Sequence, residues 1–381
     1  MTPKVVGYLT VICLSTCREG IRARYEDEMT LKCKWLTIAD RSDGRDNNFN
    51  LLRMLAAIGV LVSHAYPVTR GPGTPQLLEG WLKGVTLGDA CVLIFFAISG
   101  FFITRSFDRK KNLRVFVLAR ILRIFPALAV MLALTVFVAG LWVSTTKDLQ
   151  FWTSGAQYAI RNFLLFLPAP DLPGLFTTNP FGPIVNSSLW TLSYEVMCYL
   201  WVLACGLLGL LDRPRAFLIA LSIFTIALAA KAFWDMTTRF ETLVYLGLPF
   251  IIGMSFYIWR SVIPLSGTLA LSLVILAALL HPTPVFLPVM ILAMSYAVFV
   301  VGYAKIPGLG QYNKLGDYSY GTYIYAFPLQ QTAVAVGLAT PLLNIAAALP
   351  LAVICAVISW RYIEAPALKM RRWTAPAHSV F

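Results

Sequence analysis

Long apolar stretches separated by short polar connections fill most of the chain after residue 48. Each stretch approaches the length that crosses a ~30 Å hydrocarbon core, which takes about twenty residues at about 1.5 Å each. The pattern predicts an all-α integral membrane protein with about ten transmembrane helices. Their expected ranges are about 49–68, 85–104, 117–143, 189–211, 216–234, 241–259, 265–281, 284–303, 317–337 and 341–361.

The longest connection, residues 144–188, contains two further features. Residues 151–167 (FWTSGAQYAIRNFLLFL) have the composition of an interfacial or re-entrant helix. Residues 168–183 (PAPDLPGLFTTNPFGP) are rich in Pro and Gly, which predicts a loop.

Lysine and arginine are unevenly distributed between the two sides of the predicted bundle. Residues 1–48 contain eight of them and residues 105–123 contain seven, whereas 69–84 and 144–188 contain two each. Because basic residues accumulate on the cytoplasmic side, both termini are predicted to be cytoplasmic and 144–188 to lie outside.

The same pattern divides the chain into a basic cytoplasmic tail (1–48), a transmembrane domain (49–365) and a short cytoplasmic tail (366–381). Residues 1–48 could also reflect a start assigned upstream of the true one, since Met29 is available. The apolar stretch after Lys4 resembles a short signal sequence, but cleavage there would place basic residues outside.

The composition supports a membrane protein, with 58% hydrophobic and 13% charged residues. The net charge of +13 lies mainly at the ends of spans, so a lipid bilayer, rather than a nucleic acid, is the expected partner. The seven cysteines form no Cys-x-x-Cys pair, and neither a metal site nor a disulfide framework is indicated.

Three polar residues inside the predicted spans are candidates for chemistry. Arg53 and His64 lie eleven residues apart in the first span, which separates them by roughly 16 Å along a helix. Glu195 lies in the fourth span, at a distance from its outer end that resembles the position of His64 in the first. Charged groups within a bilayer cost about 2.5–3.5 kcal/mol on insertion scales and usually mark functional sites. Histidine can also act as polar glue between helices, and Glu195 could simply lock two helices together.

Several sequence blocks occur in a defined order. The first span contains Arg-x10-His (Arg53, His64), and the second ends in the block 93–104 (LIFFAISGFFIT), which includes Ser99 and Gly100. Arg120-x-x-Arg123 lies at the cytoplasmic start of the third span, and the block 186–195 (NSSLWTLSYE) leads into the fourth. Residues 315–328 (LGDYSYGTYIYAFP) and 360–366 (WRYIEAP) follow near the C-terminus.

From about residue 49 to 366, these blocks resemble the membrane acyltransferase family 3 in its stand-alone form. The family's second histidine, in the block 315–328, corresponds to Ala326 here, so His64 is the one histidine that lies in a matched block. Glu364, in the last block, is expected to cap the final helix.

The resemblance implies an enzyme that moves an acyl group, most simply acetyl, from cytoplasmic acetyl-CoA to a hydroxyl of a surface or exported carbohydrate or glycolipid. A multi-pass protein of the plasma (inner) membrane is expected, with acetyl-CoA as a co-substrate and no metal. The implied catalytic residues are His64 and Glu195. The implied acyl-CoA-binding residues are Arg53, Arg120, Arg123 and Ser99, and the implied substrate-side residues are Trp190, Ser193 and Tyr323.

Each assignment has a chemical basis and an alternative. A neutral imidazole can accept the proton of an attacking hydroxyl, and two arginines three residues apart can hold phosphates on one helix face. The arginines could instead be topology signals, and Ser99 and Gly100 could serve helix packing. A transporter would show interrupted helices in two related halves, and the sequence shows no such symmetry. A membrane glycosyltransferase would need acids in an early outer loop, and residues 69–84 contain only Glu79.

Overall fold

The computed structural model describes residues 35–44, 46–142, 149–165, 169–215, 217–219, 222–223, 226, 238–308 and 311–370. These residues form helices and no β-strand, apart from two isolated bridges, Thr37 with Pro264 and Asp171 with Ile184. In chain order the elements are α2 (Ile38–Ser42), α3 (Phe49–Arg70), α4 (Leu87–Asp108), α5 (Leu113–Leu134), the π-helical turn η1 (Thr135–Ala139), α6 (Gly140–Trp142), α7 (Leu149–Leu164), the 3-10 turn η2 (Ser187–Leu189), α8 (Trp190–Leu207), η3 (Leu210–Asp212), α10 (Thr238–Ile258), α11 (Gly267–Leu279), α12 (Phe286–Tyr303), α13 (Tyr312–Leu315), α14 (Ser319–Ala335), α15 (Pro341–Ser359), the π-helical turn η5 (Trp360–Glu364) and α16 (Ala365–Met370).

The predicted all-helical membrane fold is confirmed in its coarse form. Within the described part of the chain, seven helical segments are long and apolar enough to cross a membrane. They are Phe49–Arg70, Leu87–Asp108, Leu113–Val138, Ser187–Leu207, Thr238–Ile258, Phe286–Tyr303 and Pro341–Met370.

Three of the ten predicted spans differ from this set. The prediction at 265–281 corresponds to α11, which has 13 residues, and the prediction at 317–337 corresponds to α14, which has 17. Both are shorter than a full span of about twenty residues. The predicted span 216–234 lies largely outside the described residues. The total of ten and the cytoplasmic side of the termini stay predictions.

Close contact between α4 and α10 forms the centre of the bundle. A Cβ atom on Gly100 of α4 would lie 1.9 Å from the carbonyl oxygen of Phe250, and one on Gly253 of α10 would lie 2.0 Å from that of Ala97. Only glycine permits this approach of two helix backbones. Gly100 therefore serves helix packing, one of the two roles expected for it.

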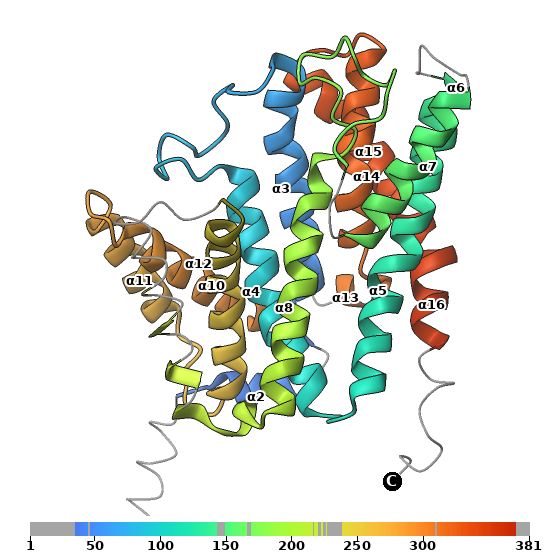
Figure 1. Ribbon diagram of the computed structural model, residues 1–381. Coiled ribbons are helices and arrows are strands. Elements are labelled where there is room, and N and C mark those ends of the chain that lie inside the picture. Colours follow the sequence, from blue (N-terminus) through green and yellow to red (C-terminus); the bar gives the residue numbers. More distant parts are fainter. Residues whose placement is uncertain are drawn as a thin grey trace, which may run out of the picture.

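The two ends of the bundle carry different structures (Figure 1). Helix α2 and the α4–α5 connection lie at one end, and the α3–α4 connection and the segment 169–186 lie at the other. The segment 169–186 is irregular, as expected, and α7 covers most of the helix predicted at 151–167. Side-chain hydrogen bonds connect the irregular segment to α14. Gln331 donates to the carbonyl oxygens of Gly182 and Ile184, and Asn186 donates to that of Ile324.

Candidate active site

A cavity lies among α3, α4, α5, α8 and α14. Its walls include aromatic side chains, among them Phe95 and Phe96 of α4. Five of the nine residues singled out in the sequence also line it, each on a different helix: Arg53, Ser99, Arg123, Glu195 and Tyr323. The structure thus brings together residues from sequence blocks that are up to 270 positions apart.

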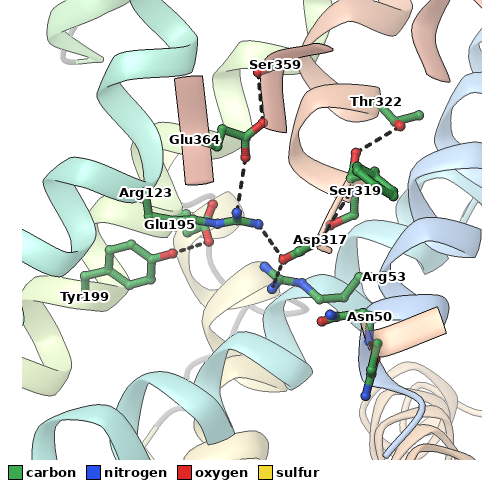
Figure 2. Close-up of polar contacts among 12 residues, drawn as sticks. Asn50, Arg53, Arg123, Glu195, Tyr199, Asp317, Ser319, Thr322, Ser359 and Glu364 are labelled. Atoms are coloured by element: carbon green, nitrogen blue, oxygen red, sulfur yellow. Dashed lines mark hydrogen bonds and ion pairs between the residues drawn. The ribbon is translucent and has the colours of Figure 1, made fainter. Parts of the chain in front are cut away.

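Asp317, just before α14, joins two of these residues. Its Oδ2 accepts hydrogen bonds from Arg53 Nη1 at 2.9 Å and from Arg123 Nη2 at 2.5 Å (Figure 2). Its Oδ1 accepts one from Ser319 Oγ at 2.5 Å. One carboxylate thereby links the guanidinium groups of α3 and α5.

A second carboxylate, Glu364, balances the charge of this group. Its Oε2 accepts from Arg123 Nη1 at 3.2 Å and its Oε1 accepts from Ser359 Oγ at 2.9 Å. The side chain of Glu364 is 1% exposed, so it points into the bundle and does not cap the last helix at the surface. Two cations and two carboxylates form a network that we call the arginine–carboxylate network, defined by Arg53, Arg123, Asp317 and Glu364. Buried charges are tolerated when they are paired in this way.

Arg53 uses only one edge of its guanidinium in the network. Nη1 binds Asp317, whereas Nε is buried without a hydrogen bond and Nη2 makes none to the described residues. The group also lies 6.0 Å from the centre of the Phe95 ring. Arg53 thus has an unused pair of N–H donors beside the cavity.

Glu195 and His64 lie in different surroundings. Glu195 lines the cavity and accepts a hydrogen bond from the hydroxyl of Tyr199, one turn further along α8. His64 is not among the lining residues. Its ring packs edge-on against Phe327 of α14 at 5.4 Å between ring centres. No hydrogen bond or ion pair joins His64 to Glu195, although both belong to the described part of the chain. The structure therefore groups Glu195 with Arg53 and Arg123 instead of with His64.

The Nδ1 atom of His64 has no hydrogen-bond partner among the described residues although it is buried. Buried polar atoms are usually hydrogen-bonded, and an unpaired one calls for an explanation. A histidine that only joined helices would use its ring nitrogens for that purpose. His64 Nδ1 makes no helix-joining hydrogen bond to the described residues.

The two arginines of the Arg-x-x-Arg block have different partners. Arg123 belongs to the network, while the guanidinium of Arg120 lies 5.8 Å from the ring centre of Phe116 and 5.6 Å from that of Tyr199. Arg120 does not line the cavity. The three-residue spacing puts both on one side of α5, and the carboxylates of Asp317 and Glu364 hold Arg123.

The three residues predicted on the substrate side lie in different surroundings. The hydroxyl of Tyr323 lies 2.6 Å from Thr191 Oγ and donates to the carbonyl of Ser188 at 3.0 Å, which fixes it in the cavity wall. Ser193 Oγ donates to the carbonyl of Leu165 at 2.6 Å and so ties α8 to the residue after α7. Trp190 is 38% exposed at the start of α8.

Sequence reasoning gave no catalytic or binding role to Asp317 or Glu364. A usable signal existed, because two arginines buried in a bundle require carboxylates, and both acids lie inside the two C-terminal blocks. Among the described residues, no group of three or more His, Cys, Asp or Glu side chains is arranged to hold a metal ion.

Comparison with known proteins places this geometry in context. The model of a family described as an acyltransferase domain matches residues 46–361. The chain is 28% identical over 302 residues to a protein named O-acetyl transferase from Shigella phage Sf6, covering 76% of this chain and 86% of the relative. It is also 28% identical over 381 residues to a protein named Nodulation protein 10 from Rhizobium leguminosarum bv. viciae, covering 87% of this chain and 96% of the relative. No solved structure matches the chain.

Proposed function

The chain belongs to the membrane acyltransferase family 3 and is an O-acetyltransferase, and we propose that it transfers acetyl from cytoplasmic acetyl-CoA to a hydroxyl of a carbohydrate or glycolipid. The observation that carries the proposal is the cavity, where Arg53, Ser99, Arg123, Glu195 and Tyr323 converge from five helices. We place the enzyme in the plasma (inner) membrane, with the α4–α5 connection in the cytoplasm and the segment 169–186 outside.

The donor would enter from the cytoplasmic end. Arg120, in the first half of α5, supplies a cation for the phosphates of coenzyme A. The pantetheine arm, an aliphatic chain with two amide groups, then occupies the cavity beside Phe95 and Phe96, with Ser99 small enough to let it pass. Arg123 contributes by holding the site together, because both of its terminal nitrogens already bind carboxylates.

The arm also explains the distance between Arg53 and His64. These residues are roughly 16 Å apart along α3, since eleven residues separate them in the helix. An extended pantetheine chain has a length of the same order, so a donor whose arm passes Arg53 would bring its thioester toward His64. The thioester would thereby reach the outer half of the bundle, where an acceptor beyond the outer leaflet is accessible.

The reaction assigned to this centre is a direct transfer. The acceptor hydroxyl oxygen attacks the thioester carbon while His64 accepts the hydroxyl proton, the C–S bond breaks, and the proton passes to the departing thiolate. The unpaired Nδ1 atom supports this role for His64. Glu195 would interact with the acceptor or the arm within the cavity, while Trp190, Ser193 and Tyr323 shape the acceptor side.

The test is transfer by the purified protein in lipid vesicles. Release of free coenzyme A from acetyl-CoA is measured with and without candidate glycans, and acetylated glycan is identified by mass spectrometry. His64→Ala should abolish transfer while the protein stays folded. Transfer by the parent should also fall as the pH drops through the pKa of His64, because only the neutral imidazole accepts a proton.

The matched control is His281→Ala. His281 lies just after α11, where its Nε2 is 3.0 Å from the carbonyl oxygen of Trp81, and this variant should transfer like the parent. Near-parental acetylation by His64→Ala would contradict the mechanism. A parent protein that releases no coenzyme A with any glycan, but moves a glycolipid across the vesicle, would favour a transporter.

A further inference from the structure

We propose that Asp317 is a positioning residue: it holds Arg53 by one amino group so that the opposite guanidinium edge receives an oxygen atom of the donor's pantetheine arm. The proposal rests on the proposed function, because it assumes an acyl-CoA donor in the cavity. Asp317 itself does not line the cavity and would act through Arg53.

The carboxylate of Asp317 is fixed in orientation. Oδ1 accepts from both the hydroxyl and the backbone N–H of Ser319, at 2.5 Å and 3.3 Å. Oδ2 is shared by Arg53 and Arg123, which come from two different helices. A carboxylate held on both oxygens is restrained in rotation, and it draws the Nη1 side of the Arg53 guanidinium toward Asp317.

The edge of Arg53 that remains consists of Nε and Nη2, whose N–H bonds point the same way. Such an edge can bind one or two oxygen atoms in a defined direction. Nε is buried without a partner, and an unsatisfied buried donor is unfavourable. Because Arg53 lines the cavity, a ligand oxygen there would satisfy this edge.

The charges near Arg53 favour a neutral oxygen over a phosphate. The two guanidinium groups of the network are already balanced by Asp317 and Glu364. Glu195 adds a carboxylate to the same cavity. A phosphate placed there would add negative charge beside three carboxylates, whereas an amide carbonyl of the arm needs only hydrogen-bond donors. The geometry therefore assigns the arm, and not the phosphates, to Arg53.

The experiment compares Asp317→Asn with Asp43→Asn, a control that also removes one carboxylate from an arginine ion pair. Asp43 pairs with Arg109 on the exposed surface and belongs neither to the arginine–carboxylate network nor to the cavity wall. Asp317→Asn should raise KM for acetyl-CoA about tenfold or more, while Asp43→Asn leaves KM near the parental value. In an Arg53→Lys background, Asp317→Asn should have little additional effect on KM, because lysine offers no edge to position.

A second measurement separates the arm from the phosphates. Adenosine 3′,5′-bisphosphate contains phosphates but no pantetheine, and its inhibition constant should be the same for the parent and for Asp317→Asn. An inhibition constant that rises in parallel with KM would overturn the assignment to the arm. If Asp317→Asn does not fold, Asp317→Glu keeps the charge but displaces it, and the same pattern is expected in weaker form.

The outcomes distinguish the inference from the function on which it rests. A parent protein without acetyl-CoA-dependent transfer would reject the proposed function. If the parent is active and Asp317→Asn has the parental KM for acetyl-CoA but lower thermal stability, the positioning role of Asp317 is rejected and the proposed function is not.

Discussion

Arg123→Ala is predicted to destabilise the protein more than any other single change in the arginine–carboxylate network. The Arg123 side chain is 13% exposed, and its removal leaves Glu364, at 1% exposure, without a cation. Asp317 keeps Arg53 but loses its shorter contact. Two hydrogen bonds between charged groups are lost, each worth about 1.5–3 kcal/mol, and breaking a buried pair typically costs about 3–5 kcal/mol. We therefore expect a loss of about 3–5 kcal/mol.

Thermal unfolding in detergent can measure this loss. Cys91, Cys198 and Cys205 are buried free thiols, so a thiol-reactive fluorophore reports their exposure on unfolding. Arg120→Ala is the comparison, because Arg120 lies three residues before Arg123 on α5 and is the other arginine of the block. This variant should bind acetyl-CoA about ten- to a hundredfold more weakly, as expected for one lost charge-assisted phosphate contact.

A double variant tests the physical cause. Arg123→Ala combined with Glu364→Ala removes the carboxylate that the single change leaves unpaired, and it should recover part of the lost stability. The reasoning is refuted if Arg123→Ala unfolds like the parent and loses acetyl-CoA binding. Arg123 would then be a phosphate ligand, and its ion pairs would be dispensable.

Three further outcomes are expected. Glu195→Gln should reduce transfer strongly without unfolding the protein, as measured by release of coenzyme A beside the thermal scan. Gly100→Ala should prevent α4 from packing against α10 and abolish folded protein. Gly80→Ala should be tolerated, because its added Cβ meets nothing within 4 Å. Size-exclusion chromatography distinguishes the two outcomes. A reporter that is active only outside the cytoplasm should be active when fused after Lys147 and inactive after Lys111 or Phe381, and the reverse pattern would overturn the predicted sidedness.

The hydrophobic pattern predicted most of the helices, because a helix in a bilayer needs a continuous run of apolar side chains that face either lipid or the other helices. The first span was expected at 49–68 and α3 covers Phe49–Arg70. The third was expected to begin at 117, yet α5 begins at Leu113, because a helix can continue past the apolar core with basic side chains reaching toward water. The fourth was expected to end at 211, but its helix ends at Leu207, shortly before Gly209 adopts a left-handed conformation with φ of 68°.

Part of the cavity lining was predictable from the sequence, but its contacts were not. Sequence blocks identified Arg53, Ser99, Arg123, Glu195 and Tyr323, which line one cavity, whereas His64, Arg120, Trp190 and Ser193 do not line it. The ion-pair partners of the two arginines could not be inferred from neighbouring sequence positions, because Asp317 lies 264 positions from Arg53 and Glu364 lies 241 positions from Arg123. Depth along separate helices suggested Glu195 beside His64, but depth takes no account of which helix faces meet. The contacts described for the two residues are with Tyr199 and with Phe327, respectively.

The charge balance of the network connects stability with the proposed reaction. Cations near the cytoplasmic end of a membrane bundle are needed to attract an anionic donor, but inside the bundle they are unstable without carboxylates. Asp317 and Glu364 meet that requirement and occupy both terminal nitrogens of Arg123. Arg53 binds only one carboxylate oxygen and therefore remains able to bind a ligand. The same ion pairs thus stabilise the packing of α3, α5 and α14 and leave one guanidinium edge available beside the cavity, which is the property that a donor-binding residue requires.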